Sequence, residues 1–332
     1  MSIEEIDCAR GASQPPEFTR HELEGPELSL CRTFYPLGFT AEVRTNSEEI
    51  LCLFEQAWGW LERKFKTEPI EVHVLLTEAE STECPPTPVY RLMQPLLIGT
   101  ADAHNYSVVD LDHNRTLITV SRAALRHTRY LRHFFLDSAA TSHIATRHAT
   151  PVHAGCVGLD GRGILLCGDS GAGKSSLSYA CARAGWSYIT DDCSFLLNVS
   201  RDRTVIGDSR RVRLRPSAAN LFPEINGLKM TPRAVGKPSI EMETASLPHL
   251  TCSQTAQADY VIFLNRRGGG PPTLQPYSKE VARSFMRRVL YGSAESLALQ
   301  YEVIERMLNA EILELRYSEI GWAVDRLERL LR

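Results

Sequence analysis

The sequence predicts an α/β protein in two parts, a smaller α+β domain at residues 1–148 and a larger α/β domain at residues 149–332. A length of 332 residues suits two domains of ordinary size. Hydrophobic residues make up 43% of the chain and charged residues 23%, which is typical of folded globular proteins and too apolar for a disordered one. The pattern of the sequence changes near residues 150–151. Beyond that point a strand, a glycine-rich loop, a helix and a second strand follow one another.

Charge and cysteine usage narrow the class of protein. The 37 basic and 40 acidic residues give a net charge of −3, which argues against binding nucleic acid or a membrane surface through bulk charge. No apolar stretch approaches the ~20 residues of a membrane span, and the first ten residues do not resemble a signal peptide. The nine cysteines are scattered and never form a C-x-x-C pair, which is typical of reduced thiols. We therefore expect a cytoplasmic protein.

The first part mixes helical and strand-like patterns after a polar leader of about 27 residues, which we expect to be loose. A helical stripe begins after a capping residue, Ser47 or Asn46, and the segment 70–76 alternates as a half-buried strand does. The elements expected in this part are a helix at 47–65, a strand at 70–76, a loop at 78–88, strands at 106–111 and 116–120, and one or two helices at 121–147.

The second part opens with an apolar strand at 163–167, a glycine-rich loop, a helix at 174–184 and a strand at 186–190. Gly185 follows the helix, and glycine commonly ends a helix there. Further elements expected are strands at 194–199, 204–206, 212–215, 239–242, 258–265 and 312–316, and helices at 279–291, 294–308 and 320–331.

The loop between the first strand and helix of this part matches the phosphate-loop pattern G-x-x-x-x-G-K-[ST] without a mismatch. Glycines allow successive backbone N–H groups to surround phosphate oxygens, and the helix N-terminus adds a favourable field. We expect Lys174 to neutralise charge on the β- and γ-phosphates and the Ser175 hydroxyl to hold magnesium. The expected nucleotide-binding residues are Gly168, Asp169, Ser170, Gly171, Ala172, Gly173, Lys174, Ser175 and Ser176.

Two adjacent acids, Asp191 and Asp192, follow the strand at 186–190. The carboxyl ends of neighbouring strands meet at the ligand crevice of an open α/β sheet. Neighbouring strand side chains point apart, so one carboxylate could face a metal while the other faces an acceptor hydroxyl as a general base. An ordinary solvated turn is the alternative interpretation, which the preceding phosphate loop disfavours.

Taken together, His153-Ala154, the strand, GDSGAGKSS, a helix closing on Arg-Ala-Gly and the Asp191-Asp192 pair resemble the catalytic domain of HPr kinase/phosphorylase. The resemblance covers residues 150–270. It implies a P-loop kinase domain of the HPr kinase and phosphoenolpyruvate carboxykinase type, with ATP as the phosphoryl donor and Mg²⁺ as its metal. On this resemblance Asp191 is the general acid/base, Asp192 or Ser175 holds the metal, and His153 lies beside the phosphates.

The chain departs from the family pattern in two places. The segment Glu-Ile-Asn-Gly-Leu at 224–228 has Asn where the family's E-I-R-G segment has Arg. On the resemblance Glu224 is a second metal ligand, and the alternative is an ordinary surface acid. Residues before 150 do not resemble the family's usual N-terminal domain. We expect this N-terminal part to select the substrate or to build a homo-oligomer.

These observations favour an ATP-dependent kinase that phosphorylates a hydroxyl group of a protein, a peptide or a small molecule. The hydroxyl group that we expect is that of a serine. Whether HPr is the acceptor and whether the reverse reaction occurs stay open. The alternative is a nucleotide-binding sensor or assembly module that transfers nothing, since such a module needs only the loop. Arg211, Arg213 and Arg215 alternate on one strand face, which we interpret as a solvated face rather than a docking strip.

Overall fold

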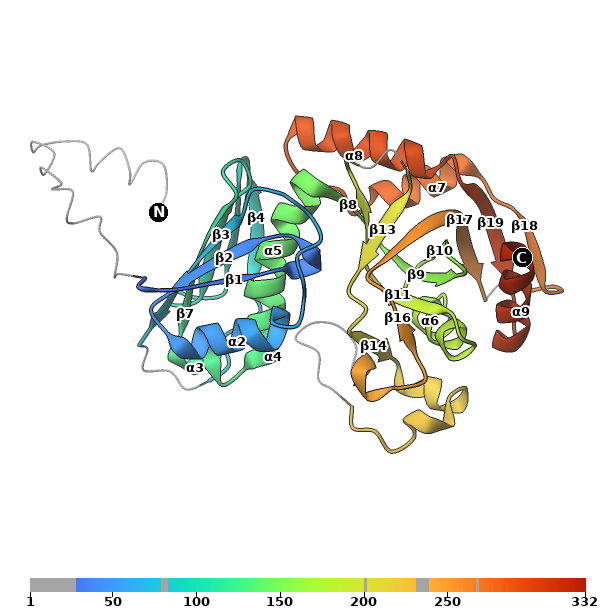
Figure 1. Ribbon diagram of the computed structural model, residues 1–332, viewed down its shortest axis with the longest axis horizontal. Helices are drawn as coiled ribbons and strands as arrows, with labels where there is room; N and C mark the ends of the chain where they lie inside the picture. The colour runs from blue at the N-terminus through green and yellow to red at the C-terminus, as the bar shows by residue number, and fades with distance from the viewer. Residues whose placement is uncertain (1–27, 79–82, 200–201, 231–238, 267–268) are drawn as a thin grey trace, which may run out of the picture.

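The computed structural model describes residues 28–78, 83–199, 202–230, 239–266 and 269–332. The predicted loose leader lies outside these residues, so its conformation stays a prediction. Two large sheets lie side by side, one built from residues 30–121 and the other from residues 149–316 (Figure 1). The chain is therefore a mixed α/β protein, as the sequence predicts.

The first sheet has seven strands in the order β1-β2-β3-β7-β6-β5-β4. Strand β3 runs parallel to both neighbours, β2 and β7, and the remaining pairs are antiparallel. The strands are β1 (Leu30–Phe34), β2 (Ala41–Thr45), β3 (Ile70–Thr77), β4 (Val89–Met93), β5 (Leu96–Thr100), β6 (Tyr106–Asp110) and β7 (Arg115–Ser121).

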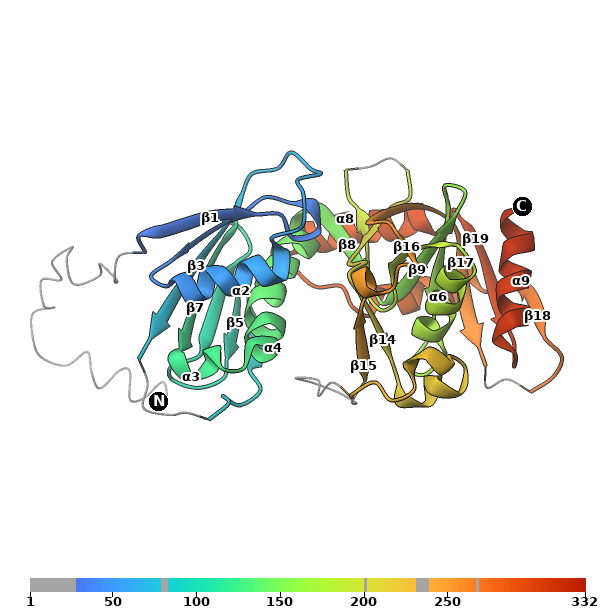
Figure 2. The same ribbon diagram turned by 60° about the horizontal axis from the view of Figure 1, so that its bottom comes forward.

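Helices cover one face of this sheet, where α2 and the α3–α5 segment lie together (Figure 2). Burial alternates residue by residue along β3, as expected for a strand with one covered face. The long helical segment predicted at 121–147 is present as α3 (Arg122–Leu125), α4 (Thr128–Leu131), η3 (Arg132–Asp137), α5 (Ser138–His143) and η4 (Ile144–His148).

The helix predicted at 47–65 is shorter than expected. It is α2 (Glu48–Trp58), and the Ser47 hydroxyl accepts a hydrogen bond from the Ile50 N–H, as the predicted cap requires. Gly59 forms the C-cap, because glycine is a poor helix former. Leu61 lies at helical spacing and is buried, but it reaches the core from an irregular segment.

The second sheet follows the order β16-β11-β9-β10-β17-β13-β12-β8, with β19 and β18 beyond β17. Strand β10 lies between antiparallel β9 and parallel β17. The strands are β8 (Ala149–Val152), β9 (Ala154–Leu159), β10 (Arg162–Cys167), β11 (Ser187–Thr190), β12 (Ser194–Leu197), β13 (Thr204–Gly207), β16 (Thr251–Cys252), β17 (Thr255–Asn265), β18 (Thr273–Pro276) and β19 (Glu311–Arg316). A separate ribbon pairs β14 (Arg211–Leu214) with β15 (Ile240–Glu243).

Helices cover both faces of the second sheet. Ile164 and Leu166 of β10 pack in one core with α6 (Lys174–Arg183) and α9 (Ile320–Leu331). Leu165 and Cys167 point the other way, into a core shared with α7 (Lys279–Arg287) and α8 (Ala294–Met307). Within the described part of the chain, no helix has the length and apolar character that a membrane span requires.

The two sheets share contacts across the boundary predicted near residue 148. Phe195 and Leu197 of β12 are buried in the core of the first sheet. The Gln300 side chain of α8 donates from Nε2 to the Ala145 carbonyl at 2.8 Å. The Arg210 guanidinium donates to the Ala57 carbonyl at the end of α2. Residues from the first part therefore lie close to the carboxyl end of β11, where Asp191 and Asp192 are.

Candidate active site

The predicted phosphate loop occupies residues 168–173, between β10 and α6. Gly168, Gly171 and Gly173 have φ angles of 145°, 89° and 105°, a region that favours glycine. A Cβ atom on Gly173 would lie 2.8 Å from Tyr317 Oη and 2.9 Å from Arg266 Cδ. The loop therefore needs glycine at its last position both for backbone conformation and for space.

Lys174, the first residue of α6, is buried against this loop with an exposed fraction of 6%. Its Nζ atom donates to the Gly168 carbonyl at 2.6 Å and to His153 Nε2 at 3.1 Å. Burial lowers the pKa of Lys174, and the nearby carboxylates of Asp192, Asp169 and Asp191 oppose that shift. The loop thus holds an ammonium group where the phosphates of a nucleotide would lie.

His153, between β8 and β9, lies between the loop and the acids. Its Nε2 atom contacts Lys174, and its Nδ1 atom lies 3.6 Å from Asp192 Oδ1. Because the ammonium is donor only, Nε2 accepts and the ring proton is on Nδ1, facing Asp192. Burial and the Lys174 charge lower the pKa of His153, with Asp192 opposing them. The neutral imidazole therefore lies between the Lys174 ammonium and the Asp192 carboxylate and links the loop to the acids.

Asp191 is almost fully buried, with an exposed fraction of 5%. Tyr188 Oη donates to its Oδ1 atom at 3.1 Å, whereas Oδ2 is buried without a hydrogen-bond partner. Burial and the adjacent Asp192 charge raise the pKa of Asp191 to about 6, against the effects of Ser175, Arg213 and Tyr188. An unpaired carboxylate oxygen with a pKa just below neutral suits a group that takes a proton.

A cavity of about 610 Å³ joins the loop to these acids. It is lined by His153, Ser170, Gly171, Gly173, Lys174, Ser175, Ser176, Asp191, Asp192, Arg213, Leu214, Arg215, Ser217, Ala218, Asn220, Leu221, Ser239 and Arg266. The structure thus brings the predicted loop, His153 and both acids to one cavity. Its size falls within the range of small-molecule sites.

Basic residues lie around this cavity, and two of them, Arg266 and Arg288, were not predicted there. Arg215 Nη2 donates to Ser170 Oγ at 3.1 Å, and Arg288 Nη1 donates to Asp169 Oδ1 at 3.2 Å. Arg266 lies at the carboxyl end of β17, with its guanidinium carbon 5.6 Å from the centre of the Tyr317 ring. The rule that carboxyl ends of parallel strands meet at the ligand crevice could have identified Arg266, since β17 is parallel to β10.

The interpretation of the arginine strip as a solvated face is wrong for Arg211 and Arg213. Both pair with glutamates of β15: Arg211 Nε lies 2.6 Å from Glu243 Oε1, and Arg213 Nε lies 3.3 Å from Glu241 Oε2. The glutamates come from a strand paired across the β14–β15 ribbon. The strip is therefore ion-paired, and its far end reaches the loop at Ser170.

The prediction that Glu224 is a metal ligand is not supported. Its Oε1 atom lies 3.0 Å from Arg183 Nε and accepts from Tyr179 Oη at 3.1 Å. Both partners come from the C-terminal half of α6, whereas the loop lies at the helix's N-terminus. Glu224 also does not line the loop cavity. Its carboxylate is held by Arg183, so we withdraw it from the site.

Oxygen donors in the loop cavity fit a magnesium ion. Ser175, Asp191 and Asp192 line it together, and Asp191 Oδ2 is without a hydrogen-bond partner. Mg²⁺ prefers oxygen ligands and is usually bound through one or two carboxylates together with phosphate oxygens and water. No cluster of three or more His, Cys, Asp or Glu suited to a metal occurs among the described residues. The oxygen donors present would hold a magnesium ion together with phosphate oxygens.

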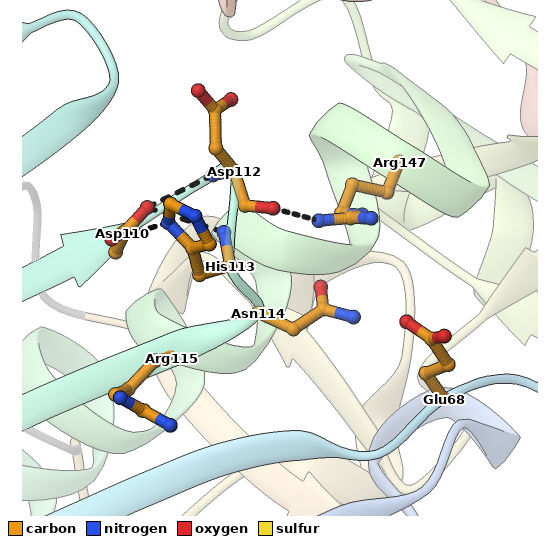
Figure 3. A pocket seen from close by; sticks show the side chains of 7 residues that line it. All are labelled: Glu68, Asp110, Asp112, His113, Asn114, Arg115 and Arg147. Carbon is orange, nitrogen blue, oxygen red and sulfur yellow. Dashed lines mark hydrogen bonds and ion pairs between the residues drawn. The ribbon is translucent and has the colours of Figure 1, made fainter.

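A separate cavity lies at the β6–β7 turn of the first sheet (Figure 3). It is lined by Glu68, Asp110, Asp112, His113, Asn114, Arg115 and Arg147. Two pairs of its polar groups bind each other: His113 Nδ1 lies 2.9 Å from Asp110 Oδ2, and Arg147 Nη1 donates to the Asp112 carbonyl at 2.8 Å. It shares no residue with the loop cavity, so we do not count it as part of the site.

Comparison with known proteins identifies relatives of the chain. A curated HPr kinase/phosphorylase from Bacillus subtilis (strain 168) is 30% identical over 230 residues, covering 69% of this chain and 63% of that protein. This chain is HPr kinase-related. The predicted resemblance is thus confirmed. The HPr kinase-related chain spans somewhat less than two thirds of that relative's length.

Among solved structures, the Hpr(Ser) kinase/phosphatase from Coxiella burnetii matches this HPr kinase-related chain with a TM-score of 0.32 and 15% identity. That match covers 55% of this chain and 97% of the other. No family model matches the chain.

Proposed function

We propose that this chain is a kinase that transfers the γ-phosphoryl group of ATP, with Mg²⁺, to a hydroxyl group. The observation that carries the proposal is the single cavity lined by the glycine loop, Lys174, His153 and the Asp191–Asp192 pair. A module that only bound a nucleotide would need the loop but not a buried, unpaired carboxylate oxygen beside it. The relationship to HPr kinase/phosphorylase supports the same reaction class.

In the proposed reaction the loop and Lys174 hold the β- and γ-phosphates. Asp191 Oδ2 accepts the proton of the acceptor hydroxyl as its oxygen forms a bond to the γ-phosphorus. The bond from that phosphorus to the β–γ bridging oxygen breaks, and ADP leaves. His153 orients the Lys174 ammonium from one side and contacts Asp192 on the other. Ser175 and Asp192 would hold the magnesium ion, which neutralises phosphate charge when it is bound.

The remaining parts of the proposal follow from the sequence. We propose a serine hydroxyl as the acceptor group and HPr as one candidate carrier, because HPr is named in the relative that matches. We further propose that residues 1–148 and 149–332 are two domains, the first selecting the substrate or building a homo-oligomer. A cytoplasmic location and the absence of nucleic-acid and membrane partners stay predictions.

The test is transfer of label from γ-labelled ATP in the presence of Mg²⁺. The purified chain is incubated with HPr, free L-serine and a serine-containing peptide, beside Lys174→Ala and Asp191→Asn. We expect Lys174→Ala to lose nucleotide affinity. Asp191→Asn should keep nucleotide affinity within threefold and lose transfer by about 10²–10⁴-fold, the usual contribution of a general base.

Asp325→Asn is the matched control, because it removes the same charge from the exposed side of α9 and does not line the loop cavity. It should transfer label at the rate of the unmodified chain. Lys174-dependent binding of ATP with no transfer above the Asp191→Asn background would overturn the kinase and leave the nucleotide-binding sensor as the function.

A further inference from the structure

A smaller cavity, of about 310 Å³, lies beside the loop cavity and shares Asp191, Asp192 and Arg213 with it. The loop residues do not line it. Its other walls come from both parts of the chain: Pro36, Leu37, Trp58, Leu61, His133, Asp137, Ala140 and Thr141 from the first, and Thr190, Cys193, Phe195, Gly207, Asp208, Arg210, Arg211 and Gln254 from the second. A molecule in this smaller cavity would therefore reach Asp191 without occupying the nucleotide's space.

The wall from the first part is largely apolar and firmly held. Leu37, Leu61 and Ala140 give it a hydrocarbon surface, and Trp58 lies among them. The Trp58 indole donates to Asp137 Oδ1 at 3.2 Å. Asp137 Oδ2 accepts from Arg132 Nε, also at 3.2 Å. This wall suits a short carbon skeleton, and its acid is already engaged.

The wall from the second part carries three arginines, and each has a carboxylate partner among the described residues. Arg210 Nε donates to Asp208 Oδ1 at 2.6 Å. Arg211 pairs with Glu243 and Arg213 with Glu241. These cations are neutralised, so the cavity offers little to an anionic ligand. The unpartnered Asp191 Oδ2 instead requires a hydrogen-bond donor, such as a hydroxyl group.

Because both parts of the chain line this smaller cavity, we call it the interlobe cavity. We propose that it binds the acceptor, and that the acceptor is a small primary alcohol of amino-acid size with no net negative charge, such as free L-serine. The inference rests on the proposed function and specifies its substrate class. The first part of the chain then selects the acceptor directly, by forming half of the pocket. As above, the acceptor hydroxyl gives its proton to Asp191 Oδ2 as its oxygen bonds to the γ-phosphorus, and ADP leaves with the electron pair of the broken bond.

The test fills the interlobe cavity without touching the loop. Thr141 of α5 lines the cavity and is half-buried, so Thr141→Phe should occupy it. Thr128→Phe is the matched control, because Thr128 is exposed on α4 and lines neither cavity. Gln254→Phe fills the same cavity from the opposite wall and serves if Thr141→Phe does not fold.

The probes are L-serine, L-glycerate and the tripeptide Gly-Ser-Gly, each with labelled ATP and Mg²⁺. L-glycerate matches L-serine in size and configuration, but a hydroxyl replaces its ammonium group, so it carries a net negative charge. We expect transfer to L-serine at least tenfold more efficiently, in kcat/KM, than to L-glycerate or the tripeptide. Thr141→Phe should raise the KM for L-serine at least tenfold and change the Kd for ATP less than twofold, while Thr128→Phe changes neither.

The outcomes separate this inference from the proposed function. Loss of all transfer to any acceptor, HPr included, overturns the kinase itself. Transfer that is unaffected by both cavity-filling variants overturns only the interlobe site. Transfer to the tripeptide, to HPr or to L-glycerate but not to L-serine overturns the proposed substrate class.

Discussion

The loop after β10 and the apolar wall of the interlobe cavity are built in different ways. The groups of the loop site assigned to phosphoryl transfer come from two short stretches, 168–176 and 191–192, with His153 close before them, and packing adds the rim at 213–221, 239 and 266. The apolar wall draws on residues from Pro36 to Thr141, which only packing brings together. Phosphate chemistry needs a fixed local backbone, whereas recognition of an acceptor needs only a surface of suitable shape. A sequence motif can therefore identify the phosphoryl donor while the acceptor site goes unnoticed.

The largest expected effect is on the pH dependence of stability, and it comes from the first part of the chain. His143 is fully buried there. Its Nε2 atom contacts Thr116 Oγ1 at 2.8 Å, and burial lowers its pKa from 6.5 to about 4. The folded chain therefore resists a proton that the unfolded chain accepts. Stability should be unaffected above pH 6.5 and fall by up to about 3 kcal/mol as the pH drops to 4.

Urea unfolding at a series of pH values measures this effect. His143→Gln should flatten the pH dependence between 6.5 and 4. His104→Gln, at an exposed position in the same part of the chain, is the matched control. An acid transition in His143→Gln as steep as in the unmodified chain would contradict the assignment.

The second prediction concerns the loop itself. Gly173→Ala places a Cβ within 3 Å of Tyr317 and Arg266 at a φ of 105°, so the turn must move. We expect ATP affinity to fall about 100-fold, which corresponds to about 2.7 kcal/mol. Isothermal titration with ATP and Mg²⁺ measures the change.

Gly161→Ala is the control for backbone strain alone. Gly161 has a φ of 80°, but a Cβ there meets nothing within 4 Å. The variant should lose some stability and retain ATP affinity. Equal losses of affinity in both variants would mean that general destabilisation, rather than the shape of the loop, explains the first result.

The same contrast explains how much of the structure could be predicted from the sequence. Strand β10, the loop and α6 were predictable, because an apolar run, glycines and a helical segment follow one another directly. Strand β9 was missed, since its sequence Ala-Gly-Cys-Val-Gly-Leu is buried on both faces and does not alternate. The partners of Arg213 and Glu224 depend on tertiary packing, so no local pattern indicates them.

A smaller effect is expected from the basic rim of the loop cavity. Arg215 is exposed and donates to Ser170 Oγ, so its guanidinium lies at the phosphate loop without being buried in it. Arg215→Gln should weaken ATP binding about fivefold, or about 1 kcal/mol, and the loss should shrink at high salt. Titration at low and high ionic strength measures both. Arg126→Gln, on the exposed surface of the first part, should leave ATP binding unchanged.

The smallest effect tests whether the two regions are separate units at all. Ser47 caps α2 in the first part, accepting from the Ile50 N–H, and Ser278 caps α7 in the second, accepting from the Val281 N–H. Replacing either with Ala should cost about 1 kcal/mol. Because Phe195 and Leu197 of the second sheet are buried in the core of the first, we expect one cooperative thermal transition. Each variant should then lower the same Tm by about 2 °C.

Calorimetry of both variants decides between the alternatives. Two transitions, with Ser47→Ala moving only one and Ser278→Ala only the other, would contradict a shared cooperative core. That result would make residues 1–148 an independently folding domain, as the sequence predicts. It would also allow the interlobe cavity to open by movement of one domain against the other, so that acceptor binding would stabilise the contact between them.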